Sequence, residues 1–392
     1  MADAPDLWEQ QCPTCPLFRS CGGMTGAPCG CVWIGTASAH QCHMCVRVCR
    51  ERTNLAGKGG SADQHLRTTR SIAEIDLSAV RWTEWILPAF VPTGTHQLGA
   101  NTVSPVIAVT LDRLLSISRH DTSDGLVVAE RRRRVRIELR AQDNATLIAV
   151  LHGDDLTLRS FWNRDRRRLF AHLRSLGFAA ATGPTFSVVT DSRERLPFEN
   201  QLSLRRHHQV VQEIADAGLV PIPNLYSAGS ANEAELGAWL RAESSVRLVS
   251  RDFSRTKGIG ADFHLQLSQL SRILSLAGRP MHVLLQGISI GKARLTANAL
   301  RMVGASCSVV SGQPILRAIV VGERLVSDSA GSGRFVKARS RERLRLAAEN
   351  VREAERIFTR ACAAPAAPRQ SSPRRDRRGR STSYRVGTER AS

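Results

Sequence analysis

Eight cysteines near the start of the chain form its densest group of reactive side chains. Their spacing is C-x2-C-x5-C-x7-C-x-C and then C-x2-C-x3-C, and they are Cys12, Cys15, Cys21, Cys29, Cys31, Cys42, Cys45 and Cys49. Thiolates bind zinc in tetrahedral sets of four and also hold iron–sulfur clusters. The N-terminus lacks a cationic leader before an apolar segment, so we expect a cytoplasmic, reducing location in which disulfides are rare. The spacing therefore predicts a metal-binding module, with a [4Fe–4S] cluster favoured and zinc as the alternative.

The segment CHMCVRVC (42–49) resembles the second half of the cysteine run of bacterial ferredoxins. Its three cysteines match C-x2-C-x3-C, but Arg50 stands where proline is usual and Ala39 where an earlier cysteine is expected. The resemblance implies three cluster ligands that need a fourth from the upstream cysteines. The order of the spacings is the reverse of the radical S-adenosylmethionine signature, so we do not expect that chemistry.

Three aspartates, Asp155, Asp191 and Asp252, are candidate catalytic residues. Converging carboxylates shift one another's pKa values, which suits acid–base, nucleophilic or metal-binding roles. The alternative is that each caps a helix or pairs with a nearby arginine. Other polar residues follow apolar runs and are candidate substrate contacts. They are His152, Asp154, Ser187, Arg205, Arg206, Asn224, Arg251, Gln286 and Gln313.

The candidate residues lie among six alternations of an apolar run and an amphipathic stretch. The runs predicted as strands are 146–152, 178–182, 219–226, 246–250, 281–287 and 306–312, with an earlier one at 104–110. Repeated strand–helix units predict a parallel sheet, either open and doubly wound or closed as a (β/α)-barrel. We favour the barrel, because its strand ends all meet at one rim, where barrels place active sites. We expect Arg205 and Arg206 to open a helix, where a guanidinium is unfavourable unless it meets an anion.

The charge balance favours polyanionic partners. The chain has 55 Lys and Arg against 35 Asp and Glu, for a net charge of +20, and nucleic acid is the commonest polyanion. Four consecutive arginines in AERRRRVRIELRAQ (129–142) predict either a solvated helix face or a nucleic-acid contact. Aromatic residues suited to base stacking are few, at 5%. No apolar run approaches the roughly 20 residues that span a bilayer, so we expect no membrane partner.

Composition divides the chain into four parts. Residues 1–51 are the cysteine-rich metal-binding module, residues 52–64 a polar linker, residues 65–362 the barrel-like domain, and residues 363–392 a disordered arginine-rich tail. The stretch GISIGKA (287–293) departs from the P-loop pattern, although Lys292 and the helix after it suit a phosphate.

The stretch from 147 to 227 resembles a family of domains of unknown function found on bacterial chromosomes, phages and plasmids. The family pattern has an aspartate at a strand end, a helix with tryptophan, a P-x-F-S turn, an acidic residue, an Arg- and Asn-rich helix start and a Pro-Asn strand. The matching residues are Asp154, Asp155, Trp162, Pro184, Phe186, Ser187, Asp191, Asn200, Arg205, Arg206, Pro223 and Asn224. The resemblance implies a (β/α)-type fold and brings no established activity.

Two functional hypotheses follow from these patterns. The first is an enzyme that acts on nucleic acid or a nucleotide at an aspartate-lined rim, with base modification or exchange as one version by analogy with barrel transglycosylases. The second is a non-catalytic ligand- or nucleic-acid-binding protein of a mobile-element or defence system, with a structural zinc or iron–sulfur module. Exchange of Asp155, Asp191 or Asp252 for asparagine separates the two.

Overall fold

The fold is that of a computed structural model. It describes residues 24–25, 48–49, 75–80, 87–93, 104–120, 127–139, 141–188, 197–254, 256, 258–327, 333–338 and 342–363. Of the eight N-terminal cysteines only Cys49 falls within these ranges, in β2 (Val48–Cys49), which pairs in parallel with β1 (Met24–Thr25). The other seven cysteines of the predicted ligand set, the linker and residues 364–392 of the basic tail therefore lie outside the described residues.

Eight parallel strands form the centre of the structure, in two four-stranded sheets. The first sheet is β4 (Val106–Thr110), β5 (Thr146–Val150), β6 (Phe178–Thr182) and β7 (Val220–Ile222); the second is β3 (Phe90–Pro92), β10 (Ser306–Ser311), β9 (His282–Gln286) and β8 (Leu248–Asp252). One parallel bridge joins β3 to β4 and another joins β7 to β8. The strands thus close into a ring in chain order. The expected α/β fold with a parallel sheet is confirmed.

Side-chain alternation along the strands separates an inner core from an outer one. The inner core draws on all eight strands and consists of Val91, Val106, Ala108, Ile148, Val150, Ala180, Val220, Ile222, Leu248, Leu284 and Val310, all buried. The intervening residues, such as Val249 and Leu285, pack outward against the helices. This alternation therefore determines whether a polar side chain at a strand end points into the ring or out toward the helices.

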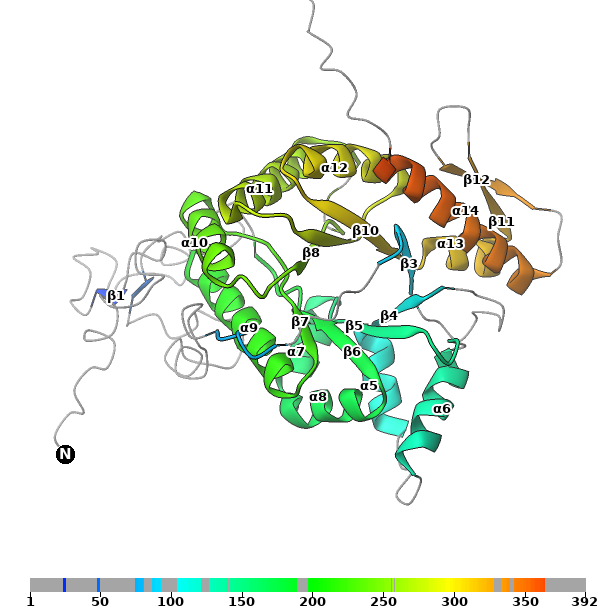
Figure 1. Ribbon diagram of the computed structural model, residues 1–392, viewed down its shortest axis with the longest axis horizontal. Helices are drawn as coiled ribbons and strands as arrows, with labels where there is room; N and C mark the ends of the chain where they lie inside the picture. The colour runs from blue at the N-terminus through cyan, green and yellow to red at the C-terminus, as the bar shows by residue number, and fades with distance from the viewer. Residues whose placement is uncertain are drawn as a thin grey trace, which may run out of the picture.

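Helices cover the outside of the ring, as Figure 1 shows. They are α5 (Leu111–His120), α6 (Val128–Leu139), α7 (Asp155–Trp162), α8 (Arg166–Ser175), α9 (Pro197–Asp216), α10 (Ser230–Ala242), α11 (Ala261–Ala277) and α12 (Ile290–Met302). The amphipathic stretch after β5 forms two helices, because the Asp165 side chain accepts the Arg168 N–H and starts α8 as a new helix. Helix α9 begins at Pro197, so the prediction that Arg205 and Arg206 open it is wrong.

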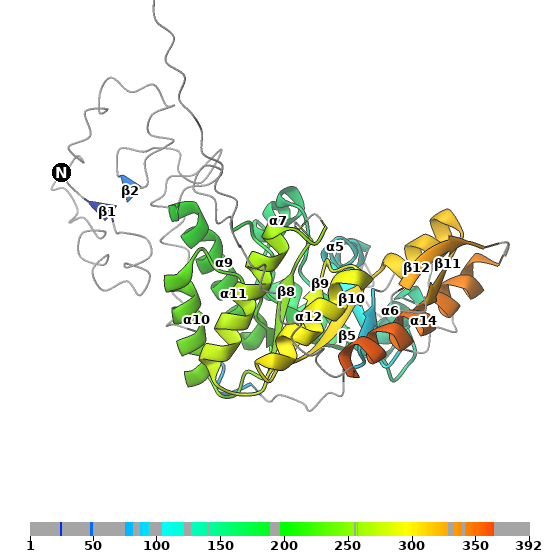
Figure 2. The ribbon, with the colours of Figure 1, turned by 90° about the horizontal axis from the view of Figure 1, so that it is seen from above.

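A C-terminal unit packs against the ring at β3. It comprises α13 (Gln313–Leu316), a π-helical turn (Arg317–Val321), the hairpin β11 (Glu323–Ser327) and β12 (Gly333–Lys337), and α14 (Arg343–Ala363). In Figure 2 the hairpin and α14 lie together at one end of the molecule. The Glu355 carboxylate of α14 accepts the N–H groups of Ala89 and Phe90, and Phe358 stacks on Phe90 with ring centroids 5.6 Å apart. Helix α14 therefore holds the short strand β3 in place.

Several arginines bind backbone carbonyls where helices end, at the amino ends of the strands. Arg132 Nε donates to the Ser175 carbonyl at 2.8 Å, and Arg136 donates to those of Gln142 and Ala145 at 2.8 Å. Arg279 caps the end of α10 in the same way. Part of the basic charge is thus used to satisfy helix C-termini. None of the helices in the described ranges is long and apolar enough to cross a membrane.

Candidate active site

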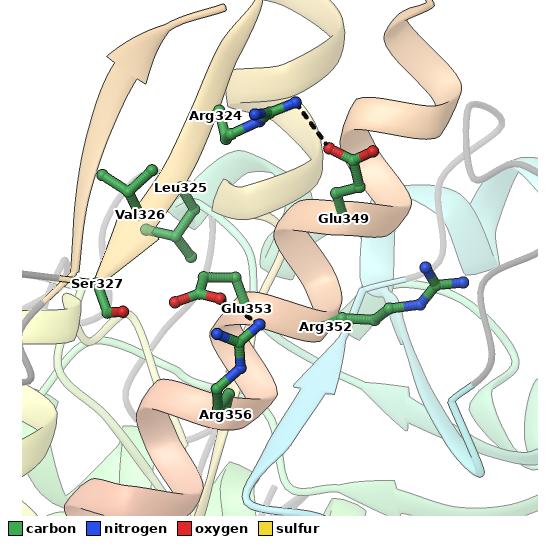
Figure 3. Close-up of a pocket in the computed structure, with 8 residues that line it drawn as sticks. All are labelled: Arg324, Leu325, Val326, Ser327, Glu349, Arg352, Glu353 and Arg356. Carbon is green, nitrogen blue, oxygen red and sulfur yellow. Dashed lines mark hydrogen bonds and ion pairs between the residues drawn. The ribbon is translucent and has the colours of Figure 1, made fainter.

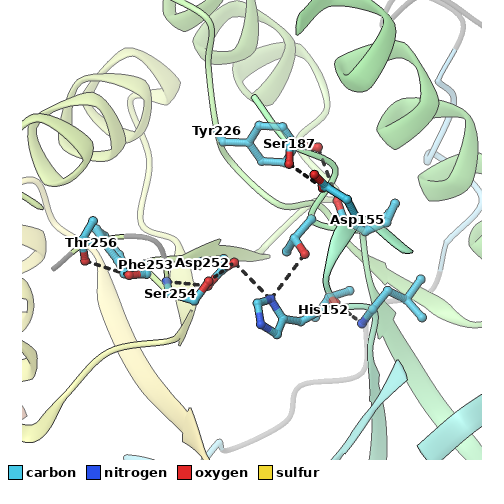
Figure 4. A network of polar contacts seen from close by, with 12 residues as sticks. His152, Asp155, Ser187, Tyr226, Asp252, Phe253, Ser254 and Thr256 are labelled. Atoms are coloured by element: carbon cyan, nitrogen blue, oxygen red, sulfur yellow. Dashed lines mark hydrogen bonds and ion pairs between the residues drawn. The ribbon is translucent and has the colours of Figure 1, made fainter. Parts of the chain in front are cut away.

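A histidine and an aspartate meet across the carboxyl ends of the strands. His152 follows β5 and Asp252 ends β8, and alternation from Val150 and from Leu248 directs both side chains into the ring. His152 Nδ1 lies 3.1 Å from Asp252 Oδ2 and 3.3 Å from Thr185 Oγ1. Figure 4 shows the two side chains pointing toward one another. The carboxylate accepts the Nδ1–H, which places the imidazole lone pair on Nε2, as a general base requires.

The turn after β8 holds the Asp252 carboxylate. Ser254 donates its backbone N–H at 2.8 Å to Oδ1 and its hydroxyl at 2.9 Å to Oδ2. Burial alone would raise the pKa of Asp252, but the bond and charge of His152 and the Ser254 bonds outweigh it and lower the pKa below its usual 3.8. The carboxylate is therefore ionised at neutral pH. Gly287, at φ +62°, packs against the Ser254 backbone, where a Cβ would lie 2.3 Å from its nitrogen.

A second aspartate binds a serine at the same rim. Ser187, 7% exposed, donates its hydroxyl to Asp155 Oδ1 at 2.6 Å, and Asp155 is the first residue of α7. Figure 4 shows this pair in one network of polar contacts with His152 and Asp252. Of the three predicted catalytic aspartates, the structure thus places two at the rim, and Asp191 lies outside the described residues.

The segment Gly183–Ser187 after β6 connects these groups. The Pro184 carbonyl accepts from Tyr226 Oη at 3.4 Å and lies 3.0 Å from His207 Nδ1. His207 Nε2 in turn accepts the backbone N–H of Asn224 at 3.2 Å, so the proton is on Nδ1. Burial lowers the pKa of His207 to about 4, against a small opposing effect of the Pro184 bond. His207 is neutral and braces the rim between β6 and β7.

Four residues at the rim are not among the predicted site residues: Thr185, Tyr226, His207 and Ser254. Thr185 and Tyr226 follow β6 and β7. They have the same position, at the end of a predicted strand, as the residues that were chosen as candidate contacts. His207 lies on α9, and Ser254 acts through a turn. The sequence carries no local signal for either contact.

Two carboxamides lie below the rim without hydrogen bonds. Asn224 and Gln286 are each 3% exposed, and neither amide atom of either side chain has a partner among the residues that the structure describes. Leaving a buried donor or acceptor unpaired costs about 1–3 kcal/mol. Both residues were predicted as substrate contacts.

The other predicted contacts lie elsewhere. Arg251 points outward between the sheet and α11, where it donates to the Leu225 carbonyl and to Gln269 Oε1 at 3.5 Å, and burial lowers its pKa to about 10. Asp154 is the N-cap of α7 and accepts from Thr157 N at 2.7 Å. Gln313 is exposed after β10.

The two arginines of α9 lie in its interior, and one of them packs on a tryptophan. Arg206 lies 5.0 Å from the Trp162 ring centroid, and Arg166 lies 4.1 Å from it. Phe186 meets the same ring edge-on at 5.8 Å. Trp162 is therefore packed among protein groups, which argues against a role as a stacking platform for bases.

No three His, Cys, Asp or Glu side chains within the described ranges come together as a metal site. Lys292, a candidate phosphate ligand, is buried between α11 and α12. It donates to the Thr256 carbonyl at 2.8 Å and to Thr256 Oγ1 at 2.7 Å, and it lies 5.1 Å from the Phe263 ring centroid. Burial lowers its pKa. Its position makes it part of the helix packing.

Two cavities lie away from the rim. One of about 470 Å³ lies between β11 and α14, where the Arg324–Glu349 ion pair joins the two elements and the Arg356–Glu353 pair lies along α14 (Figure 3). The other, of about 850 Å³, lies at the amino ends of β6 and β7 and includes Arg132 and Arg174. Neither contains a residue predicted for the site.

The fold and the rim together describe a parallel α/β protein with a polar site at the carboxyl ends of its strands. Two solved structures are similar to this chain. A structure of L-ribulose 3-epimerase has 11% identity and a TM-score of 0.34, covering 72% of this chain and 100% of its own. A crystal structure of dihydrodipicolinate synthase from Aquifex aeolicus has 13% identity and a TM-score of 0.32, covering 70% of this chain and 80% of its own. No protein-family model and no curated protein matches the chain.

Proposed function

We propose that this chain is an enzyme that performs acid–base chemistry at the strand ends on nucleic acid or a nucleotide, with base modification or exchange as the reaction class. The contact between His152 and Asp252 carries the proposal. The ionised carboxylate orients the ring, and Nε2 accepts a proton from the substrate. Such an arrangement stabilises the imidazolium that forms when the proton is transferred.

Asp155 is the second catalytic group in this proposal. Its hydrogen bond from Ser187 holds the carboxylate at the start of α7, beside the network of His152. Asp191 is proposed as a third. The net charge of +20 favours a polyanionic substrate.

The cysteine module and the family assignment are further proposals. The eight N-terminal cysteines would hold a [4Fe–4S] cluster, or zinc as the alternative, and no catalytic step is assigned to them. Anaerobic purification with iron, zinc and sulfide analysis tests the module, and colourless protein with stoichiometric zinc would exclude the cluster. Membership in the family that residues 147–227 resemble is proposed because the turn they share, Pro184–Ser187, contacts the rim histidines and Asp155.

The test is turnover by the full chain. The protein is incubated with RNA and DNA oligonucleotides and with nucleosides, and the products are identified by mass spectrometry. His152→Gln, Asp252→Asn and Asp155→Asn should each lower the rate by at least about 100-fold, with unchanged metal content and thermal stability. The matched control is Asp165→Asn, because asparagine is an equally good N-cap for α8. Nucleic-acid binding without product in any of these proteins would support the alternative, a non-catalytic binding protein.

A further inference from the structure

The Asn224 and Gln286 carboxamides, which have no hydrogen-bond partner in the described part of the chain, flank Asp252 on the inner face of the ring. Asp252 and Gln286 are direct register partners on β8 and β9. Asn224 is the register partner of Ser250, two residues before Asp252 on β8. Alternation from Ile222, Leu248 and Leu284 of the inner core directs all three side chains inward. Three neighbouring strands therefore present an amide, a carboxylate and an amide.

Two other buried carboxamides, Asn350 and Gln212, have hydrogen-bond partners for both of their amide atoms. Asn350 Oδ1 accepts the Leu325 N–H at 2.7 Å, and its Nδ2 donates to the Pro314 and Glu323 carbonyls at 2.9 Å. Gln212 accepts the Asp76 N–H and donates to the Asp76 carbonyl and to Asp216. Buried polar groups in native proteins are nearly always satisfied, and those that are not call for a missing ligand or water. Among the described residues, Asn224 and Gln286 are the two whose amide nitrogen and oxygen both lack a partner, and both lie at the rim.

We propose that Asn224 and Gln286 bind the hydrogen-bonding edge of a nucleobase and so present the base to His152 and Asp252. A carboxamide offers a donor and an acceptor side by side, which matches the paired acceptor and donor on a base edge. The ionised Asp252 between the two amides disfavours an anionic group such as phosphate. This inference rests on the proposed function and names the part of the substrate that the site takes.

The inference is tested by titration calorimetry of the full chain with adenine, guanine, cytosine and uracil, and with ribose and inorganic phosphate as comparison probes. At least one base should bind, and ribose and phosphate should not bind at the same concentrations. Binding of ribose or phosphate with no base bound would overturn the inference.

Apolar replacements give the decisive comparison. Asn224→Leu and Gln286→Met should each weaken base binding by at least about tenfold while the Tm stays level or rises, because an unpaired buried polar group is removed. The controls are Asn350→Leu and Gln212→Met, which remove satisfied amides. They should lower the Tm by more than about 3 °C and leave base affinity unchanged. If the rim variants lose stability as the controls do and bind bases normally, the carboxamides are structural and the inference fails.

One further variant separates this inference from the proposed function. His152→Gln should bind the base with unchanged affinity but turn it over at least about 100-fold more slowly. If base binding depends on Asn224 and Gln286 but turnover is unaffected by His152→Gln, the proposed catalytic role of His152 is refuted and the base-binding site is retained. Absence of base binding in the unmodified protein would refute the base site alone.

Discussion

Oδ2 of Asp252 lies 3.1 Å from Nδ1 of His152. Asp252 ends β8 and His152 follows β5, and these strands belong to different four-stranded sheets. Single bridges at Thr93–Ala108 and Asn224–Ser250 join those sheets. The contact therefore exists only because the strands close into a ring. A substitution that disturbs the closure of the ring should therefore also disturb the contact between His152 and Asp252.

The first prediction concerns the tautomer of His152. In the unmodified protein Asp252 should hold the proton on Nδ1, and ¹⁵N NMR of the imidazole should show a protonated Nδ1 and an unprotonated Nε2 above the titration of the ring. Asp252→Asn removes the anionic acceptor and should give a mixture of the two tautomers. The same spectrum in both proteins would show that Asp252 does not orient the ring.

The second prediction concerns the glycine behind Ser254. Gly287→Ala should destabilise the protein by about 2 kcal/mol or more, because φ is +62° and the new Cβ meets the Ser254 backbone. The Ser254 amide, which binds Asp252, should shift in an NMR spectrum. Gly291→Ala is the control. Gly291 lies on α12 with open space at its Cβ position, so the change should stabilise by about 0.5–1 kcal/mol. Denaturant unfolding measures both.

The third prediction concerns the ion pair between α8 and α9. Arg166 binds Glu213 through Nε at 2.7 Å and through Nη2 at 2.8 Å, and the side chains are 12% and 8% exposed. Glu213→Ala should cost about 3 kcal/mol, because it leaves a largely buried guanidinium without its carboxylate. Arg345→Ala removes a pair in which the arginine is 74% exposed and should change stability by less than about 0.5 kcal/mol. Equal losses of stability for the two variants in urea unfolding would contradict a larger contribution from the buried Arg166–Glu213 pair.

The fourth prediction concerns acid stability. The pKa of His207 is lowered to about 4 in the folded protein, so between pH 6.5 and 4 the unfolded chain binds a proton that the folded chain does not. Stability should therefore fall as the pH drops through that window, by up to about 3 kcal/mol from this residue. His207→Gln should reduce this dependence in thermal unfolding at a series of pH values, and the part that remains includes His282, whose pKa burial also lowers to about 4. His264→Gln, at an exposed position on α11, is the control and should leave the slope unchanged.

Much of the fold was predictable because the strands of a parallel sheet that is covered on both faces are continuous apolar runs. Strands β5, β6, β8, β9 and β10 were expected within a few residues of their bounds. Strand β3 was missed because it has three residues and depends on Glu355 and Phe358, far along the chain. The apolar pattern gives no sign of the break between α7 and α8, because the cap at Asp165 lies within a helical periodicity.

The candidate site was predictable in part for a similar reason. Polar residues at the ends of predicted strands were chosen as candidates, and among them were His152, Asn224, Asp252 and Gln286. The structure places all four on the inner face of the ring. Arg251 was chosen in the same way, but it lies one residue from Asp252 and so points outward. Adjacent strand residues point to opposite faces. The choice between faces requires knowledge of which face is the interior.

The amino-acid sequence by itself determined the order of strands and helices, the polar character of the strand ends and the positive charge, because these depend on local apolar periodicity and composition. Only the tertiary structure decided that His152 meets Asp252, that Gln286 lies beside it, and that Arg251 and Lys292 face the helices. Those contacts join residues far apart in the chain, and strand register and ring closure set them. No local pattern encodes them.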